Sequence, residues 1–295
     1  MAYQPISDET RTQLVNLFLP PVNQIFDSGV IQRPVVDNEP YSSASKKIKN
    51  SHRDNILDNG RADFDTDSDG LTGMQKVDLY CYYYFQMHCA SSFQFYLNET
   101  EFLQETLANR AVWFIDIGCG PFTSGLVFNS WLKQYAPVGI SANYVGIDIS
   151  KNMLTKAEQI LESTPNLRFN EYFFLNNKNE ALGTINENGE QEIVIILNYS
   201  YLFASTSLDV QDFLQFTNSL RESYPQARFI IFQQNPRRPD LNEKWEEYKS
   251  QLVGFTSKVG YPHRFGMSFD DILESCNYLK PNFGNKIKCD LLKSF

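Results

Sequence analysis

Two acidic residues and a pair of glycines are the residues of this chain best suited to hold a ligand. Asp116 lies near the end of the apolar run 112–117, Gly118 and Gly120 follow it directly, and Asp148 lies near the end of a second run at 144–149. Such runs are typical of buried parallel strands, and glycine lets the backbone bend sharply beside a ligand. With a helical pattern at 125–135 between them, the two runs form a nucleotide-binding strand–helix–strand unit.

The spacing of the glycine turn separates the classes of nucleotide site. A dinucleotide fingerprint has a third glycine three residues after the second, and this chain has Thr123 there. A Walker phosphate-binding loop needs Gly-Lys followed by Ser or Thr, which the turn does not contain. Both features weigh against nicotinamide dinucleotides and nucleoside triphosphates as ligands.

The run Asp-Ile-Gly-Cys-Gly-Pro at 116–121, with Asp148 on the next strand, resembles the first two motifs of the class I S-adenosylmethionine-dependent methyltransferases. The resemblance extends from about Val112 to the C-terminus. It implies an α/β fold with a Rossmann-like, mostly parallel sheet, helices on both faces and a C-terminal antiparallel strand. We expect residues 1–110 to form an N-terminal helical cap and residues 111–295 to form the S-adenosylmethionine-binding domain.

The resemblance implies S-adenosylmethionine as the cofactor and assigns residues to it. The glycine turn would admit its methionine moiety and ribose, and Asp148 would accept both ribose hydroxyls, because a carboxylate has two acceptor oxygens. Ile149 and Met153 would flank the adenine ring, and Asn176 would contact the adenine amino group. The full set of expected cofactor-binding residues is Asp116, Gly118, Cys119, Gly120, Asp148, Ile149, Met153, Asn176 and Asn198.

Two residues of the turn leave alternatives open. Phe122 stands where many members of the family have a third glycine, so its ring would either narrow the pocket mouth or face the core. Cys119 is interpreted as a small packing residue rather than a nucleophile, because no histidine lies near it in the sequence.

Candidate substrate residues follow a fourth predicted strand at 192–197. Open α/β sheets bind ligands outside the carboxyl ends of their strands, so Tyr199 and Tyr201 would lie where the methyl group meets its acceptor. Local packing explains both tyrosines equally well. The Asn-Pro-Pro-Tyr motif, with which a subset of the family methylates DNA bases, does not follow this strand. His263 is a candidate base, with a surface role as the alternative.

Composition limits which partners, cellular location and metal sites are expected. The 295 residues carry a net charge of −9, which disfavours unaided binding to nucleic acid without excluding it. Such binding would require the basic cluster 46–53 and Arg237-Arg238 to share a face. We expect a cytoplasmic protein, since neither a signal peptide nor a membrane-spanning run is indicated. Five cysteines without framework spacing predict reduced thiols, and no ligand spacing predicts a metal site.

An acidic segment precedes the glycine strand. We expect a mobile loop over about 37–70, in which Asp-Thr-Asp-Ser-Asp-Gly at 65–70 imitates the opening of a calcium-binding loop. Lys76 stands where such a loop needs its bidentate glutamate, which favours a solvated acidic turn over a calcium site.

A helical pattern at 72–107 is unusually aromatic in its first half. Consecutive tyrosines at 82–84 cannot all face one core, because neighbouring helical positions diverge by about 100°. The aromatic residues either pack this helix between the N-terminal region and the sheet, or cover the cofactor and line a substrate pocket.

The function that the resemblance implies is in-line transfer of the sulfonium methyl group to an acceptor. A dry, aligned pocket supplies most of the rate enhancement, so no catalytic triad is needed. The acidic surface and the tyrosines favour a small or cationic molecule as acceptor. The alternatives are a non-catalytic S-adenosylmethionine-binding partner or sensor, and an RNA or protein methyltransferase.

Overall fold

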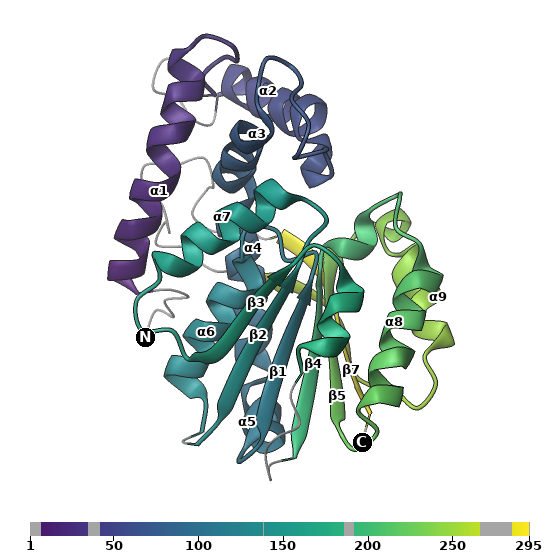
Figure 1. Ribbon diagram of the computed structural model, residues 1–295. Helices are drawn as coiled ribbons and strands as arrows, with labels where there is room; N and C mark the ends of the chain where they lie inside the picture. The colour runs from purple at the N-terminus through teal and green to yellow at the C-terminus, as the bar shows by residue number, and fades with distance from the viewer. Residues whose placement is uncertain (1–6, 35–41, 138, 186–191, 266–284, 295) are drawn as a thin grey trace.

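A sheet of seven strands forms the centre of the molecule. In the computed structural model, which describes residues 7–34, 42–137, 139–185, 192–265 and 285–294, the strand order is β3-β2-β1-β4-β5-β7-β6 (Figure 1). The strands are β1 (Ala111–Ile117), β2 (Ser141–Ile147), β3 (Phe169–Leu175), β4 (Ile193–Ser200), β5 (Arg228–Pro236), β6 (Thr256–Phe265) and β7 (Asn285–Ser294).

Strand direction confirms the predicted Rossmann-like sheet. β3, β2, β1, β4 and β5 pair in parallel, whereas β7 runs antiparallel to both β5 and β6. Successive residues of β1 enter opposite cores, with Phe114 in one and Ile115 in the other. Because helices cover both faces, the strand needs an apolar residue at almost every position, which explains its unbroken apolar run.

The helices divide between the two faces (Figure 1). One face packs against α4 (Gln86–Asn98), α6 (Thr123–Tyr135) and α7 (Lys151–Glu162), and the other against α8 (Val210–Ser223) and α9 (Glu243–Gln251). α5 (Thr100–Leu107) leads into β1 near the amino ends of the strands. The carboxyl ends of β1, β2 and β4 are thereby left for the site.

The N-terminal helices α1 (Asp8–Asp27), α2 (Ser43–Ser51) and α3 (Gly73–Tyr80) precede the sheet, and α2 and α3 lie beyond the carboxyl ends of its strands in Figure 1. The expected mobile loop over about 37–70 is wrong for residues 43–56, which are helical. The hydroxyl of Ser42 starts α2 by accepting the Ser45 N–H at 3.1 Å. This helix buries polar residues, Ser45 and Lys49, so its sequence lacks the apolar stripe that would have revealed it.

A π-helical turn, Cys81–Phe85, joins α3 to α4. Such a turn adds a residue to the helical repeat and is common at functional sites. All five of its residues are buried. The aromatic run therefore packs between the N-terminal helices and the sheet, and its three consecutive tyrosines have little contact with solvent.

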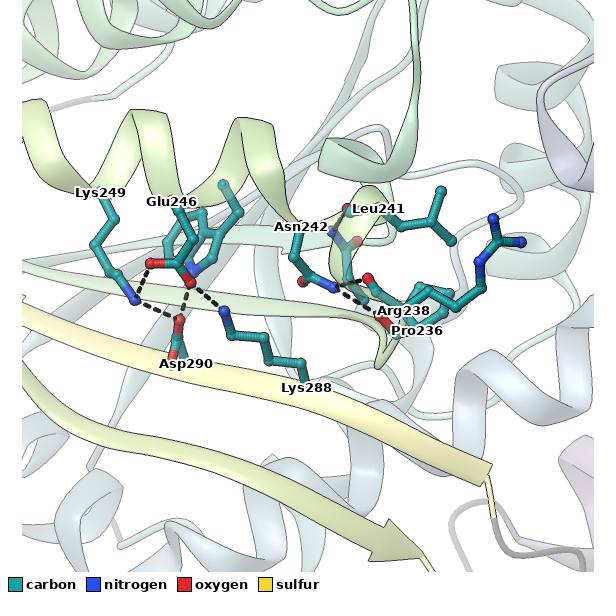
Figure 2. Close-up of polar contacts among 10 residues, drawn as sticks. Pro236, Arg238, Leu241, Asn242, Glu246, Lys249, Lys288 and Asp290 are labelled. Carbon is teal, nitrogen blue, oxygen red and sulfur yellow. Dashed lines mark hydrogen bonds and ion pairs between the residues drawn. The ribbon is translucent and has the colours of Figure 1, made fainter.

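Asp290 of β7 fixes α9 to the second face of the sheet (Figure 2). Its buried carboxylate accepts the indole N–H of Trp245 and an ammonium hydrogen bond from Lys249, the latter at 3.1 Å. At the start of the same helix, the Asn242 amide donates to the carbonyls of Pro236 and Arg238 at 2.8 and 2.7 Å. None of the described helices is long and apolar enough to span a membrane.

Candidate active site

 The glycine turn follows the end of β1. Gly118 has φ +71° and Gly120 has φ +50°, both in the left-handed region that favours glycine. The N–H groups of Gly118 and Cys119 both donate to the Ile147 carbonyl, at 2.8 and 3.0 Å. A Cβ atom built on Gly120 would meet no atom beyond its chain neighbours within 4 Å, so there is open space at this residue, whereas one built on Gly118 would lie 2.9 Å from Leu202.

Asp148 joins the end of β2 to this turn. Its Oδ2 accepts the Gly120 N–H at 2.9 Å, and its Oδ1 accepts the Ser150 N–H at 2.9 Å. A carboxylate has about four acceptor sites, so each oxygen can accept one more hydrogen bond. Burial raises the pKa of Asp148 to about 6, against the opposing effect of the two N–H donors. The residue is therefore ionised and able to accept hydroxyl donors at neutral pH.

Asp116 lies in the core. Its Oδ1 accepts the Asn198 amide at 2.7 Å and its Oδ2 accepts the Tyr144 hydroxyl at 3.1 Å. The side chain is buried, and this burial raises the pKa of Asp116 to about 7. Asp116 and Asn198 were both expected to bind the cofactor, and the structure places their side chains against each other. Their role in this arrangement is to tie the ends of β1, β2 and β4 together.

The two residues expected to flank the adenine ring differ in burial. Ile149 is 89% exposed beside Asp148, whereas Met153 is buried in the core on the inner side of α7. The Asn176 amide donates to the carbonyls of Asp148 and Ile149, at 3.1 and 2.7 Å, so it braces the turn that carries them.

The remaining residues of the turn serve packing. Phe122 has φ +64° and is fully buried, with its ring edge-on to Tyr144 at a centroid distance of 4.9 Å. It faces the core and does not narrow a pocket mouth. Cys119 is buried, and its thiol points to the Gly120 carbonyl at 3.5 Å. Burial raises the pKa of this thiol, which suits the packing role.

The two tyrosines after β4 point in different directions. Tyr199 is buried on the second face, where its hydroxyl contacts those of Tyr248 and Thr217 at 3.2 and 3.4 Å. This corrects the expectation that Tyr199 contacts a substrate. Tyr201 turns back toward α4, and its hydroxyl contacts that of Ser91 at 3.0 Å. His263 belongs to the outer strand β6, and its backbone pairs with Ile287 of β7. The side chain of His263 is not among those that the structure describes.

His88 of α4 lies against Tyr201 and was not singled out by the sequence analysis. The two rings stack with centroids 4.1 Å apart, and His88 Nδ1 lies 3.2 Å from the Tyr80 hydroxyl. Burial lowers the pKa of His88 to about 3, so the imidazole is neutral at physiological pH. The spacing of Tyr80, Tyr84 and His88 in fours within a helical stretch is the signal that would have grouped them.

The acidic segment contacts the helix that follows Asp148. Asp65 accepts the N–H groups of Lys151 and Asn152, both at 3.0 Å, and the Ser150 hydroxyl at 2.8 Å. It thereby caps α7, whose first turn exposes unpaired N–H groups. A buried ion pair at 2.7 Å between Asp78 of α3 and Lys156 of α7 adds a second link between the N-terminal helices and the sheet.

The side chain of Lys76, a residue of α3, reaches into the acidic loop. Its buried ammonium donates to the Asp63 carbonyl and, at 3.3 Å, to the Ser68 hydroxyl. The chain thus supplies its own cation at this loop. Among the described residues, no group of three or more His, Cys, Asp or Glu side chains is arranged to hold a metal ion.

A described cavity lies away from the glycine turn. It measures about 500 Å³ and is lined by residues of the α4–α5 turn, including Glu99 and Phe102, together with Tyr135 and Lys258. None of the expected cofactor residues lines it. We locate the site by the glycine turn and Asp148, because these groups have the backbone shape and the acceptors that a nucleoside needs.

Comparison with known proteins gives fold-level likeness alone. No protein-family model matches the chain, and no curated protein matches its sequence. A class I S-adenosylmethionine-dependent methyltransferase of Listeria monocytogenes, described as putative, is 12% identical over 98% of this chain and 88% of its own, with a TM-score of 0.44.

Two further methyltransferase structures are similar at the same level. The magnesium protoporphyrin IX methyltransferase of Synechocystis PCC 6803, solved with bound cofactor, is 12% identical over 85% of this chain and 96% of its own, with a TM-score of 0.38. The plantazolicin methyltransferase is 15% identical over 83% and 98%, with a TM-score of 0.42. At these TM-scores the likeness carries no argument about activity, which must come from the residues of this chain.

Proposed function

We propose that this protein binds S-adenosylmethionine at the carboxyl ends of β1 and β2 and transfers its methyl group to a small acceptor. The observation that carries the proposal is the hydrogen bond from Gly120 to Asp148, which places an ionised acceptor beside a glycine that has open space at its Cβ position. The same geometry suits a ribose, whose two hydroxyls need two acceptor oxygens on one side and room for the ring on the other.

The Asp148 carboxylate is preorganised for ligand binding. Asp148 is held at both oxygens by backbone N–H groups, so its orientation costs no further ordering when a hydroxyl binds. The exposed side chain of Ile149 offers an apolar surface next to the carboxylate for the adenine ring. When bound, the cofactor supplies an electrophilic methyl group, and the protein's part is to orient it and keep water away.

A small acceptor is favoured over nucleic acid in part because three of the basic residues that nucleic acid would need are buried or paired within the protein. Lys49 is buried, Arg53 lies over the Tyr84 ring at 4.9 Å, and Arg238 pairs with Asp240 at 2.5 Å. The acidic segment around Asp65 also covers the start of α7. A polyanion approaching this edge would meet like charge.

Calorimetric titration with S-adenosylmethionine and S-adenosylhomocysteine tests the proposal. We expect micromolar binding of both ligands, and binding weaker by about 10- to 100-fold in Asp148→Ala, the loss typical of charge-assisted hydrogen bonds. Asp209→Ala, which removes a carboxylate cap from α8 on the other face, is the matched control and should bind normally. Equal affinity of NAD, or no heat with either sulfur ligand, would overturn the assignment.

A further inference from the structure

Gln234 carries a buried acceptor that no described residue satisfies. The side chain lies at the carboxyl end of β5 and is 2% exposed. Its Nε2 donates to the hydroxyls of Ser92 and Ser200, at 2.5 and 2.6 Å. Its Oε1 is left without a hydrogen-bond partner among the described residues. A buried amide oxygen in this state is costly, so a donor is expected to meet it.

The surroundings of Gln234 are those of the proposed methyl-transfer site. The Gln234 carbonyl accepts the N–H of Tyr201 at 2.7 Å, and the next residue, Leu202, lies against Gly118 of the cofactor turn. Ser92, whose hydroxyl accepts a hydrogen bond from the Gln234 amide, belongs to α4, the same helix as His88. The orphan oxygen therefore lies among residues that connect the cofactor turn to α4.

Tyr201 is held in a conformation that costs energy. Its φ of +63° is rare for an aromatic residue, and non-glycine residues in this region cluster at functional sites. Stacking on His88 and the hydroxyl contact with Ser91 keep the ring in place. Tyr80 and Tyr84 continue the aromatic surface, with ring centroids 5.0 Å apart.

This surface is uncharged at neutral pH. Burial raises the pKa of the tyrosine hydroxyls at 80, 84 and 201 and lowers that of His88, so all four rings stay neutral. Neutral aromatic side chains favour a flat, apolar ring as their partner. Charged groups that act on these rings include Asp148, which raises the pKa of Tyr80, and Arg53, which lies over the Tyr84 ring.

Resting on the proposed function, we propose that the methyl acceptor is an aromatic molecule with an N–H or O–H group, and that Gln234 Oε1 accepts the hydrogen bond from that group. Gln234 is a positioning residue in this arrangement. Its hydrogen bond directs the lone pair of the acceptor atom toward the sulfonium. The acceptor nitrogen or oxygen forms the new bond to the methyl carbon, the sulfur keeps the electron pair of the broken bond, and the released proton passes to solvent.

The test compares pairs of probes in which methyl groups replace the hydrogens of the donor. The probes are 6-aminoquinoline against 6-(dimethylamino)quinoline, and 2-naphthol against 2-methoxynaphthalene, titrated into protein saturated with S-adenosylhomocysteine. We expect the N–H and O–H probes to bind about tenfold more tightly than their methylated counterparts. Gln234→Met should abolish this difference while S-adenosylhomocysteine affinity stays unchanged.

Two further variants keep the result interpretable. Gln233→Met changes the same residue type one position away, where the side chain faces the opposite side of β5, and should retain the preference. Gln234→Glu keeps an acceptor and should retain it too, even if Gln234→Met folds poorly. Normal S-adenosylhomocysteine binding with no preference in the native protein, or with a preference that survives in a folded Gln234→Met variant, would overturn the inference. Loss of S-adenosylhomocysteine binding by the native protein would instead overturn the proposed function.

Discussion

The Gly120 N–H donates to Asp148 Oδ2 at 2.9 Å, so the glycine turn of β1 and the acid of β2 form one hydrogen-bonded unit. The two residues are far apart along the chain, yet β1 and β2 pair in register from Ala111 with Ser141 to Ile117 with Ile147. Their turns must therefore leave the sheet side by side. A ligand that contacts one contacts the other.

Cofactor affinity should fall in acid because of Asp148. Burial raises the pKa of this carboxyl to about 6, and the ionised form, present above that pH, has the two acceptor oxygens that a ribose needs. If the ionised form alone binds, affinity for S-adenosylhomocysteine at pH 5 should be about tenfold below its value at pH 8. Titration calorimetry from pH 5 to 8 measures this profile. An equally steep profile in Asp148→Asn would contradict it.

Removal of the Asp65 carboxylate should loosen both the N-terminal helices and the cofactor site. Asp65→Ala deletes hydrogen bonds to Ser150, Lys151 and Asn152 at the start of α7. Loss of a helix cap costs about 1–2 kcal/mol, and we expect that decrease in the free energy of unfolding by urea. Cofactor affinity should drop a few-fold, since the capped turn follows Asp148. The exposed Asp54→Ala is the control, and an equal effect there would argue against a cap.

Stability should decline as pH rises because of Asp116. Burial raises its pKa to about 7, whereas an unfolded chain has the ordinary value of 3.8. The folded state therefore holds a proton that the unfolded state loses, and this contribution, complete below pH 4, disappears as pH rises to 7. Between pH 5 and 8 the loss is about 2–3 kcal/mol. Urea unfolding of the native protein and of Asp116→Asn should show a shallower slope in the variant, and identical slopes would refute the assignment.

Local sequence patterns were sufficient to predict the sheet and the glycine turn. The central strands β1, β2 and β4 contain apolar runs, and the positions of Gly118, Gly120 and Asp148 follow from where the runs of β1 and β2 end. The pairing of Asp148 with the turn is a direct result of neighbouring parallel strands. Such features depend on residues close in sequence, so one chain is enough to find them.

Contacts between segments far apart in the chain could not be predicted from the sequence. Tyr199 and Asn198 had to face opposite sides of the sheet, but only the structure shows which side carries the site. Asp65 reaches α7 across 85 residues, and its acidic neighbours suggested a solvated loop. His88 and Gln234 acquire their surroundings from the packing of α4 on the sheet, which no local pattern encodes.

The last prediction concerns the acidic loop at 65–70. Asp65, Asp67 and Asp69 stand at the alternating positions of a calcium-binding loop, and Lys76 stands where the bidentate glutamate belongs. Because the Lys76 ammonium already donates to oxygens of this loop, Lys76→Glu should destabilise the protein without metal and create a calcium site.

Calcium at about a hundred times the dissociation constant would restore about 2.7 kcal/mol to that variant. Thermal unfolding with millimolar calcium or with a chelator measures the difference. Lys76→Gln, which removes the charge without adding a carboxylate, is the matched control and should respond little, as should the native protein. An equal response to calcium in all three proteins would show that residue 76 does not set the cation preference of this loop.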